Sequence, residues 1–169
     1  MGRSIVVASG KGGVGKTSIV AGVSSCLAKL GKKTVCVDAD TGLRNLDLVL
    51  GLQEQALFDF ADVLSGRTPL ENALTPHPDI EGLFLLSAPI RTDGPTDPAA
   101  FNKLIGVLKD NSDFVFVDSP AGLGSGFSLA AGACDEAIVV VTPNQLAVRD
   151  AARCAEFLTE HAKIIVNRV

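Results

Sequence analysis

Residues 6–18 combine residue types and a spacing that suit phosphate binding. Gly10, Gly15, Lys16 and Thr17 satisfy the pattern G-x-x-x-x-G-K-[ST]. Glycines let a loop curl so that its backbone N–H groups converge on phosphate oxygens, and the lysine adds a positive charge near the outer phosphates. A hydroxyl at the position of Thr17 binds Mg²⁺ in loops of this kind. The pattern predicts a phosphate-binding loop, or P-loop, for a nucleotide with Mg²⁺.

A second lysine, Lys11, stands inside the same loop. It is either a solvent-facing loop residue or a cation that reaches phosphate groups. A positive charge delivered to phosphates during phosphoryl transfer stabilises the transition state. The spacing alone leaves both interpretations open.

Three aspartates follow apolar runs and are candidates for the metal site. Asp118 ends the run FVFVD, and Asp38 and Asp40 belong to VDAD at the end of another run. The carboxyl ends of parallel strands meet at one edge of a sheet, so we expect these side chains near the P-loop, at the metal or the attacking water. The alternative is that Asp38 and Asp40 are solvated loop acids.

The elements that must position these residues follow from the apolar pattern. Short, nearly continuous apolar runs rich in Val, Ile and Phe are typical of strands buried on both faces of a parallel sheet. They cover residues 4–9, 33–38, 83–88, 114–119, 136–142 and 163–167. Helical patterns cover residues 16–30, 97–109 and 146–161, with shorter ones within 56–66 and 68–74. The alternation predicts an α/β fold with an open, mostly parallel sheet and helices on both faces.

The sequence shows no internal boundary. Residues 75–82 and 91–98 are predicted loops within one domain, so the whole chain, residues 1–169, is expected to be a single P-loop ATPase domain. The 169 residues carry a net charge of -4, which gives no global positive field for nucleic acid. The N-terminal residues do not resemble a signal peptide, and no long apolar run occurs, so we expect a cytoplasmic protein.

The four cysteines, Cys26, Cys36, Cys134 and Cys154, contain no C-x-x-C pair. In a cytoplasmic chain this scatter favours free buried thiols over disulfides or a metal site.

Several segments resemble one family. The loop KGGVGKT is similar to the deviant Walker A loop of the MinD and ParA superfamily of ATPases. The segments GKKTVCVDADTGLRNLDLVLG, DFADVLSG, DSPAG, DEAIVV and VRD are similar, in the same order, to those of bacterial MinD ATPases, which act in septum site selection. The likeness covers essentially the whole chain and is weakest between Thr75 and Asp113.

The resemblance implies an ATP site and assigns roles to individual residues. Lys11 corresponds to the signature lysine, which reaches across a nucleotide-sandwiched dimer to phosphates on the other subunit, and it would act in catalysis with Lys16 and Asp40. Asp40 would orient the attacking water. Thr17, Asp38 and Asp118 would act at the Mg²⁺ shell. The remaining residues implied to bind ATP are Gly10, Gly12, Gly13, Val14, Gly15, Ser18, Asn45 in a first switch, Pro120 and Gly122 in a second switch, and Asn167 and Arg168 at the adenine.

The resemblance also implies partners. These are a second copy of the chain, in an ATP-dependent dimer, and the proteins MinC and MinE. The chain has no N-K-x-D guanine signature, which favours ATP over GTP. Relatives continue to a C-terminal amphipathic helix that attaches them peripherally to the inner membrane. This chain ends at IIVNRV, so we expect it to lack the family's C-terminal part and not to bind membranes.

One departure from the family affects the predicted dimer contact. The family commonly has Pro-Glu where this chain has Pro143-Asn144, with the glutamate near the ribose across the dimer.

Three alternative functions remain open from the sequence. A ParA-like partitioning ATPase would bind DNA, which the acidic balance disfavours. An iron–sulfur carrier ATPase would need a cysteine soon after DSPAG, and this chain has none there. An ATP-binding scaffold that does not hydrolyse is the third.

Overall fold

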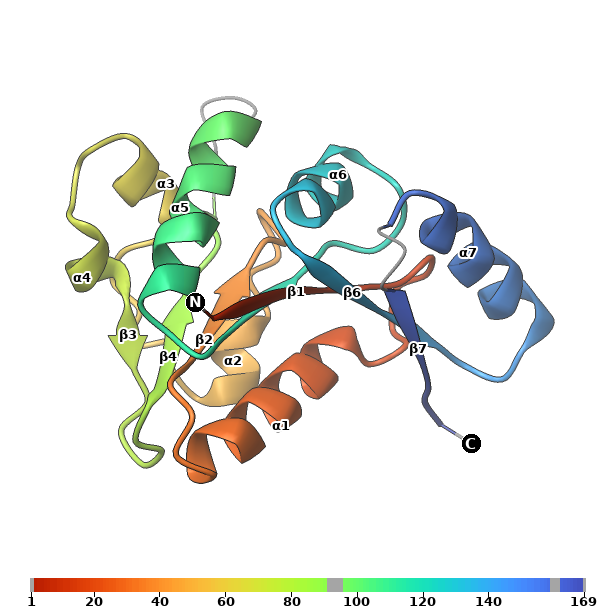
Figure 1. Cartoon of the computed structure of the whole chain (residues 1–169), viewed down its shortest axis with the longest axis horizontal. Coiled ribbons are helices and arrows are strands. Elements are labelled where there is room, and N and C mark those ends of the chain that lie inside the picture. Colours follow the sequence, from red (N-terminus) through yellow and green to blue (C-terminus); the bar gives the residue numbers. More distant parts are fainter. Residues whose placement is uncertain (1, 91–95, 159–161, 169) are drawn as a thin grey trace.

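A seven-stranded sheet forms the centre of the molecule, as shown by a computed structural model that describes residues 2–90, 96–158 and 162–168 (Figure 1). The strand order is β3-β4-β2-β5-β1-β6-β7. All neighbouring strands run parallel except β3, which pairs antiparallel with β4. The predicted open, mostly parallel sheet is therefore confirmed.

The strands and helices largely alternate along the chain. The strands are β1 (Arg3–Ala8), β2 (Thr34–Asp38), β3 (Thr75–Pro76), β4 (Leu83–Leu86), β5 (Phe114–Asp118), β6 (Glu136–Val141) and β7 (Ala162–Val166). The helices are α1 (Lys16–Lys29), α2 (Leu46–Leu50), α3 (Phe60–Leu64), α4 (Leu70–Ala73), α5 (Pro98–Asp110), α6 (Ser125–Gly132) and α7 (Gln145–Glu156). No helix of the described segments is long and apolar enough to cross a membrane.

Apolar side chains project from both faces of the sheet, because successive residues of a strand point to opposite sides. On one face, Val6 and Val117 belong to a core that includes Phe101 of α5 and Phe60 of α3. On the other face, Val7 packs in a core with residues of α1 and α2. Figure 1 shows α1 and α2 on one side of the sheet and α3, α5, α6 and α7 on the other. The fold thus has the predicted helical layer on each face.

The structure corrects several predicted boundaries. Helices α2 and α6 were not predicted, and residues 75–82, predicted as a loop, contain strand β3. Helix α7 ends at Glu156 rather than extending to residue 161, and residues 159–161 of that prediction lie outside the described residues, as does most of the predicted loop 91–98. Helices α1 and α5 match their predictions within one residue, and Asp97 caps α5 by accepting a hydrogen bond from the Ala99 N–H.

Candidate nucleotide and magnesium site

The P-loop joins the end of β1 to the start of α1, the context expected for a phosphate site. Gly13 and Gly15 adopt positive φ angles of 76° and 99°, which L side chains rarely adopt. Lys16 is buried at the first position of α1, whereas Lys11 is exposed. The two lysines of the loop therefore lie in different environments, one against the site and the other open to solvent.

Neighbouring segments fix the P-loop in place. The Ser9 hydroxyl donates to the Lys11 carbonyl at 2.7 Å, and the Gly122 N–H donates to the Ser9 carbonyl at 3.0 Å. A Cβ atom on Gly10 would lie 2.4 Å from the backbone carbon of Asp150 in α7. Gly10 is thus required by the close approach of α7, a contact that the loop sequence does not reveal.

The strand ends bring two of the predicted carboxylates together. Asp38 and Asp118 are register partners at the carboxyl ends of β2 and β5, and β5 lies beside β1. The Asp38 carboxylate accepts hydrogen bonds from the Asp40 N–H at 2.9 Å and the Leu46 N–H at 3.0 Å. Asp38 therefore also shapes the loop that follows β2, a role that the strand-end pattern does not predict.

The Asp118 carboxylate lies next to the P-loop. Thr17 and the Lys16 ammonium both act to lower its pKa, against the effect of burial. One of its oxygens, Oδ1, is buried and has no hydrogen-bond partner among the described residues. A buried carboxylate oxygen without a partner is costly, so a cation or a cation-bound water would satisfy it.

Burial raises the pKa values of all three aspartates. Desolvation raises the pKa of Asp118 to about 7 and that of Asp38 to about 6. Desolvation also raises the pKa of Asp40, against the opposing effect of the Lys16 ammonium. Carboxylates crowded in a poorly solvated place bind protons more readily, and a divalent cation would relieve the same charge.

The residues present fit Mg²⁺ of the P-loop type. Within the described part of the chain, no group of three or more His, Cys, Asp or Glu could hold a metal ion by itself. A hydroxyl at Thr17, the Oδ1 oxygen of Asp118 and phosphate oxygens form a hard oxygen donor set, which Mg²⁺ prefers. This site would be completed by the phosphates of a nucleotide.

The loop between β2 and α2 holds the predicted first switch residue. Asn45 is exposed at the N-cap of α2, and its side chain forms no capping bond. The adjacent Arg44, at φ 45°, is paired with Asp47 at 2.6 Å and donates to the Ala56 carbonyl at 2.6 Å. The sequence interpretation missed this largely buried ion pair, although the three-residue spacing of Arg and Asp in GLRNLDL is a signal for such a pair.

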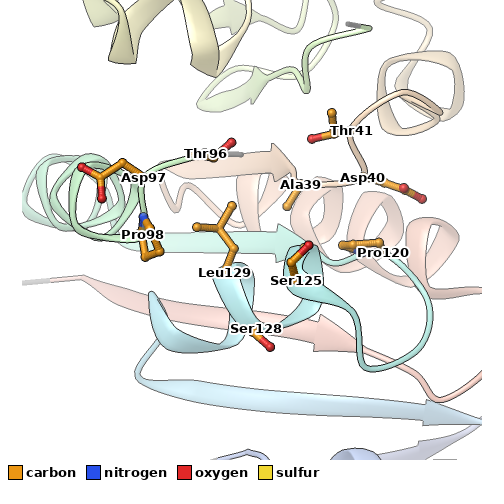
Figure 2. A pocket seen from close by; sticks show the side chains of 11 residues that line it. Ala39, Asp40, Thr41, Thr96, Asp97, Pro98, Pro120, Ser125, Ser128 and Leu129 are labelled. Carbon is orange, nitrogen blue, oxygen red and sulfur yellow. The ribbon is translucent and has the colours of Figure 1, made fainter. Parts of the chain in front are cut away.

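A cavity of about 830 Å³ adjoins the site on the side of Asp40 and Pro120. Figure 2 shows Asp40 and Pro120 near one end of it and Asp97 and Pro98 at the other. Its described lining comes from the loop after β2, the start of α5, the loop after β5 and α6. Asp40 is half-buried and is one of the residues that line this cavity.

The second predicted switch follows β5. Gly122 adopts φ 85°, and its N–H bond to the Ser9 carbonyl links this segment to the base of the P-loop. Gly126 of α6 is also constrained, because a Cβ there would lie 2.6 Å from Cγ of Pro120. The segment is therefore connected both to the P-loop and to α6.

The two residues predicted at the adenine directly follow β7. The Asn167 side-chain Nδ2 donates to the Val14 carbonyl at 2.8 Å, which places Asn167 against the P-loop. Arg168 is exposed, with φ 60°. The contact between Asn167 and the P-loop was not predicted.

Asn144, where the family commonly has glutamate, is engaged within its own chain. Its Oδ1 accepts from the Ala147 N–H at 2.8 Å and caps α7, and its Nδ2 donates to Thr142 Oγ1 at 2.8 Å.

The cysteines are free, as predicted, but not all are buried. Cys36, Cys134 and Cys154 are buried, whereas Cys26 on the surface of α1 is exposed, which corrects the expectation for that residue. Burial raises the pKa of Cys36 to about 12, so its thiol is a core group rather than a thiolate ligand.

Comparison with known proteins relates this site to nucleotide-binding relatives. The ParA family profile, described as NUBPL iron-transfer P-loop NTPase, matches residues 1–169. The septum site-determining protein MinD of Synechocystis sp. is 42% identical over 174 residues, which cover 100% of this chain and 65% of that protein. MinD of Bacillus subtilis is 40% identical over 176 residues, covering 100% of this chain and 66% of that protein.

Solved structures of MinD proteins are also similar to this chain. The MinC:MinD cell division complex of Aquifex aeolicus contains a chain of 43% identity and TM-score 0.91, with 99% of this chain and 69% of that one covered. MinD from Pyrococcus horikoshii, solved with Mg-ADP, is 33% identical with a TM-score of 0.85, covering 97% of this chain and 68% of that one. The present chain spans about 65% of the length of the curated relatives it matches.

Proposed function

Since this chain belongs to the MinD group of the ParA-type P-loop NTPases, we propose that it binds ATP with Mg²⁺, hydrolyses it, and dimerises in the ATP-bound state. The observation that carries the proposal is the meeting of three features at one sheet edge. They are the glycine-rich loop, the buried Lys16, and the buried Oδ1 of Asp118, which has no hydrogen-bond partner in the part of the chain that the structure describes. An oxygen-rich site beside a phosphate loop suits a Mg²⁺–nucleotide better than an anion alone.

Binding depends on the P-loop and on α1. Backbone N–H groups of the loop and the N-terminus of α1 bind the phosphates, and the Lys16 ammonium adds a charge toward the outer ones. Thr17, Asp38 and Asp118 would hold the metal, directly or through water. Mg²⁺, when bound, neutralises charge on the phosphates and stabilises the transition state. The structure of Pyrococcus horikoshii MinD complexed with Mg-ADP supports the same class of ligand here.

Hydrolysis needs an oriented water and added positive charge. Asp40 is half-buried and lines the cavity, and the positive charge of Lys16 lowers its pKa. It is therefore suited to orient the attacking water. Lys11 is exposed in the loop and can approach a second subunit. Its charge would reach the phosphates of that subunit and make hydrolysis conditional on dimerisation.

The nucleotide state would then act as a switch. Asn45 lies in the loop after β2, and residues 119–122 directly follow β5, so both segments would respond when the γ-phosphate leaves. Membership of the MinD group supports a role in septum site selection. The MinC:MinD complex of Aquifex aeolicus supports MinC as a partner, and MinE is proposed from the family resemblance alone.

Phosphate release in a single turnover tests the proposed activity. Protein in excess over γ-labelled ATP with Mg²⁺ is expected to release labelled phosphate, while Lys16→Ala at equal concentration releases none above background. Nucleotide that stays bound but uncleaved would identify a non-hydrolysing scaffold instead.

A further inference from the structure

We propose that Asn167 is a positioning residue for the P-loop, one that holds the loop ready for phosphates whichever base the nucleotide carries. This inference rests on the proposed function, because it concerns the same nucleotide site. It adds to the adenine contact implied for Asn167 a second role that acts on the phosphate side.

The backbone of Asn167 is hydrogen-bonded to strand β6. Its N–H donates to the Val141 carbonyl at 2.8 Å, which extends the pairing of β7 with β6 by one residue. Its side chain then reaches the P-loop, where Nδ2 donates to the Val14 carbonyl at 2.8 Å. The bond joins residues 153 positions apart and connects the end of the edge strand β7 to the loop after β1.

The contacted part of the loop needs such support. Val14 lies between Gly13 and Gly15, both at positive φ, and glycines restrict the backbone less than other residues do. Side-chain bonds to P-loop carbonyls among the described residues come from Ser9, to Lys11, and from Asn167, to Val14. Asn167 therefore fixes the second half of the loop, from which Lys16 and Thr17 follow directly.

The packing at Gly15 shows how close the contact is. A Cβ on Gly15 would lie 2.4 Å from Nδ2 of Asn167. Glycine is thus required at this position both by its φ of 99° and by the Asn167 amide. A side-chain amide has two donor hydrogens and one acceptor oxygen, so after the bond to Val14 its other hydrogen and Oδ1 remain for a base.

A test must separate the phosphate side from the base side. Calorimetric titration would compare Mg–ATP with Mg–tripolyphosphate, which has no base, on the wild type, Asn167→Ala and Asn167→Leu. Leucine branches at Cγ as asparagine does and is somewhat larger, but it cannot donate a hydrogen bond. We expect both variants to bind Mg–tripolyphosphate roughly three- to tenfold more weakly, the effect of one lost hydrogen bond, and to lose at least as much affinity for Mg–ATP, which also contacts the base side of Asn167.

Asn111→Ala is the matched control. Asn111 Nδ2 donates to the Val107 carbonyl, also at 2.8 Å, at the end of α5. Both residues precede β5, so this bond lies at the amino ends of the parallel strands, whereas the P-loop lies at their carboxyl ends. Asn111→Ala should leave both affinities unchanged. In the nucleotide-free protein, amide hydrogens of residues 13–17 should exchange faster in the two Asn167 variants and not in this control.

Two results would overturn the inference while leaving the proposed function intact. One is unchanged tripolyphosphate affinity in Asn167→Ala with weakened ATP binding, which would confine Asn167 to the base. The other is wild-type behaviour of Asn167→Leu, which would show that only its volume matters. A wild-type chain that binds neither probe would instead overturn the proposed function, and this inference with it.

Discussion

Lys16 and Lys11 differ in their surroundings although they belong to one loop. Lys16 is buried beside Asp40 and Asp118, and its charge acts on both carboxylates. Lys11 is exposed, and its backbone carbonyl accepts a hydrogen bond from Ser9. The geometry gives Lys16 a role within the subunit and leaves Lys11 accessible from outside it.

The two lysines should therefore separate in a binding experiment. Lys16→Ala removes the charge nearest the phosphates and should weaken Mg–ATP binding on the order of 10- to 100-fold or more. Lys11→Ala, measured as a monomer at low protein concentration, should change the affinity by less than about threefold, the scale of an exposed charge. Titration calorimetry or labelled nucleotide is needed, because the chain has no Trp or Tyr. Equal losses in both variants would contradict the separate roles.

Asp118 should link stability to pH in the nucleotide-free protein. Burial raises its pKa to about 7 from the usual value of 3.8. The folded state therefore binds this proton more tightly than the unfolded chain, and the cost of ionising Asp118 grows as the pH rises from about 4 to about 7, then stays constant. Asp38, whose pKa is raised to about 6, acts in the same direction.

Asp118→Asn removes this cost and should raise the free energy of unfolding at pH 8 on the order of 1 to 4 kcal/mol. At pH 5 the gain should be smaller, because Asp118 is then mostly protonated in the folded wild type. Urea unfolding at both pH values, without Mg²⁺ or nucleotide, measures the difference. An equal gain at pH 5 and pH 8 would show that the buried charge is not its cause.

At the scale of elements, the phosphate site depends on close packing between α7 and the P-loop. The contact at Gly10 is with the backbone of Asp150, which cannot move aside as a flexible side chain would. Helix α7 is in turn attached to the sheet through Ala147, Ala151 and Cys154. Movement of α7 would therefore disturb both a small core and the start of the loop.

Gly10→Ala should lower the free energy of unfolding by about 1 to 3 kcal/mol, the usual cost of overpacking. Gly106→Ala is the control, because Gly106 lies inside α5 and a Cβ added there would meet no atom within 4 Å. It should raise stability by about 0.5 to 1 kcal/mol, the helix preference of alanine over glycine. Thermal or urea unfolding checks both, and a neutral Gly10→Ala would mean that α7 tolerates displacement.

The sequence predicted the elements that carry a long pattern or a cap and missed those that depend on tertiary contacts. Helix α5 was predicted because Asp-Pro opens a periodic segment. Helix α2 has only five residues, too few for a helical period, and is held by the Leu46 N–H bond to Asp38 and by the Arg44–Asp47 pair. Helix α6 is rich in small residues and begins and ends near glycine, so local propensity did not indicate it.

The same distinction applies to the site. The P-loop and the strand-end aspartates were predictable because a local motif and a strand end specify them. The bond from Asn167 to Val14 and the contact of Gly10 with Asp150 join residues far apart in the sequence. No local pattern contains such contacts, and only the folded sheet brings these residues together.

At the scale of the whole molecule, the proposed function needs a surface that a second copy can approach. The candidate site lies where the P-loop, the loop after β2 and the loop after β5 emerge at one edge of the sheet (Figure 1). Lys11, Gly12, Gly13 and Ala121 are exposed there, and Leu123 is 41% exposed. Small residues around an exposed lysine let another backbone come close, which a shared nucleotide site requires.

The mass of the chain in solution, measured by light scattering with Mg–ATP and with Mg–ADP, tests this central claim most directly. The account predicts about 17.5 kDa with Mg–ADP and about twice that mass with Mg–ATP, and it predicts that Lys11→Ala remains at the lower mass with either nucleotide. A wild-type chain that binds Mg–ATP yet stays at 17.5 kDa, or a Lys11→Ala variant that dimerises as well as the wild type, would contradict it.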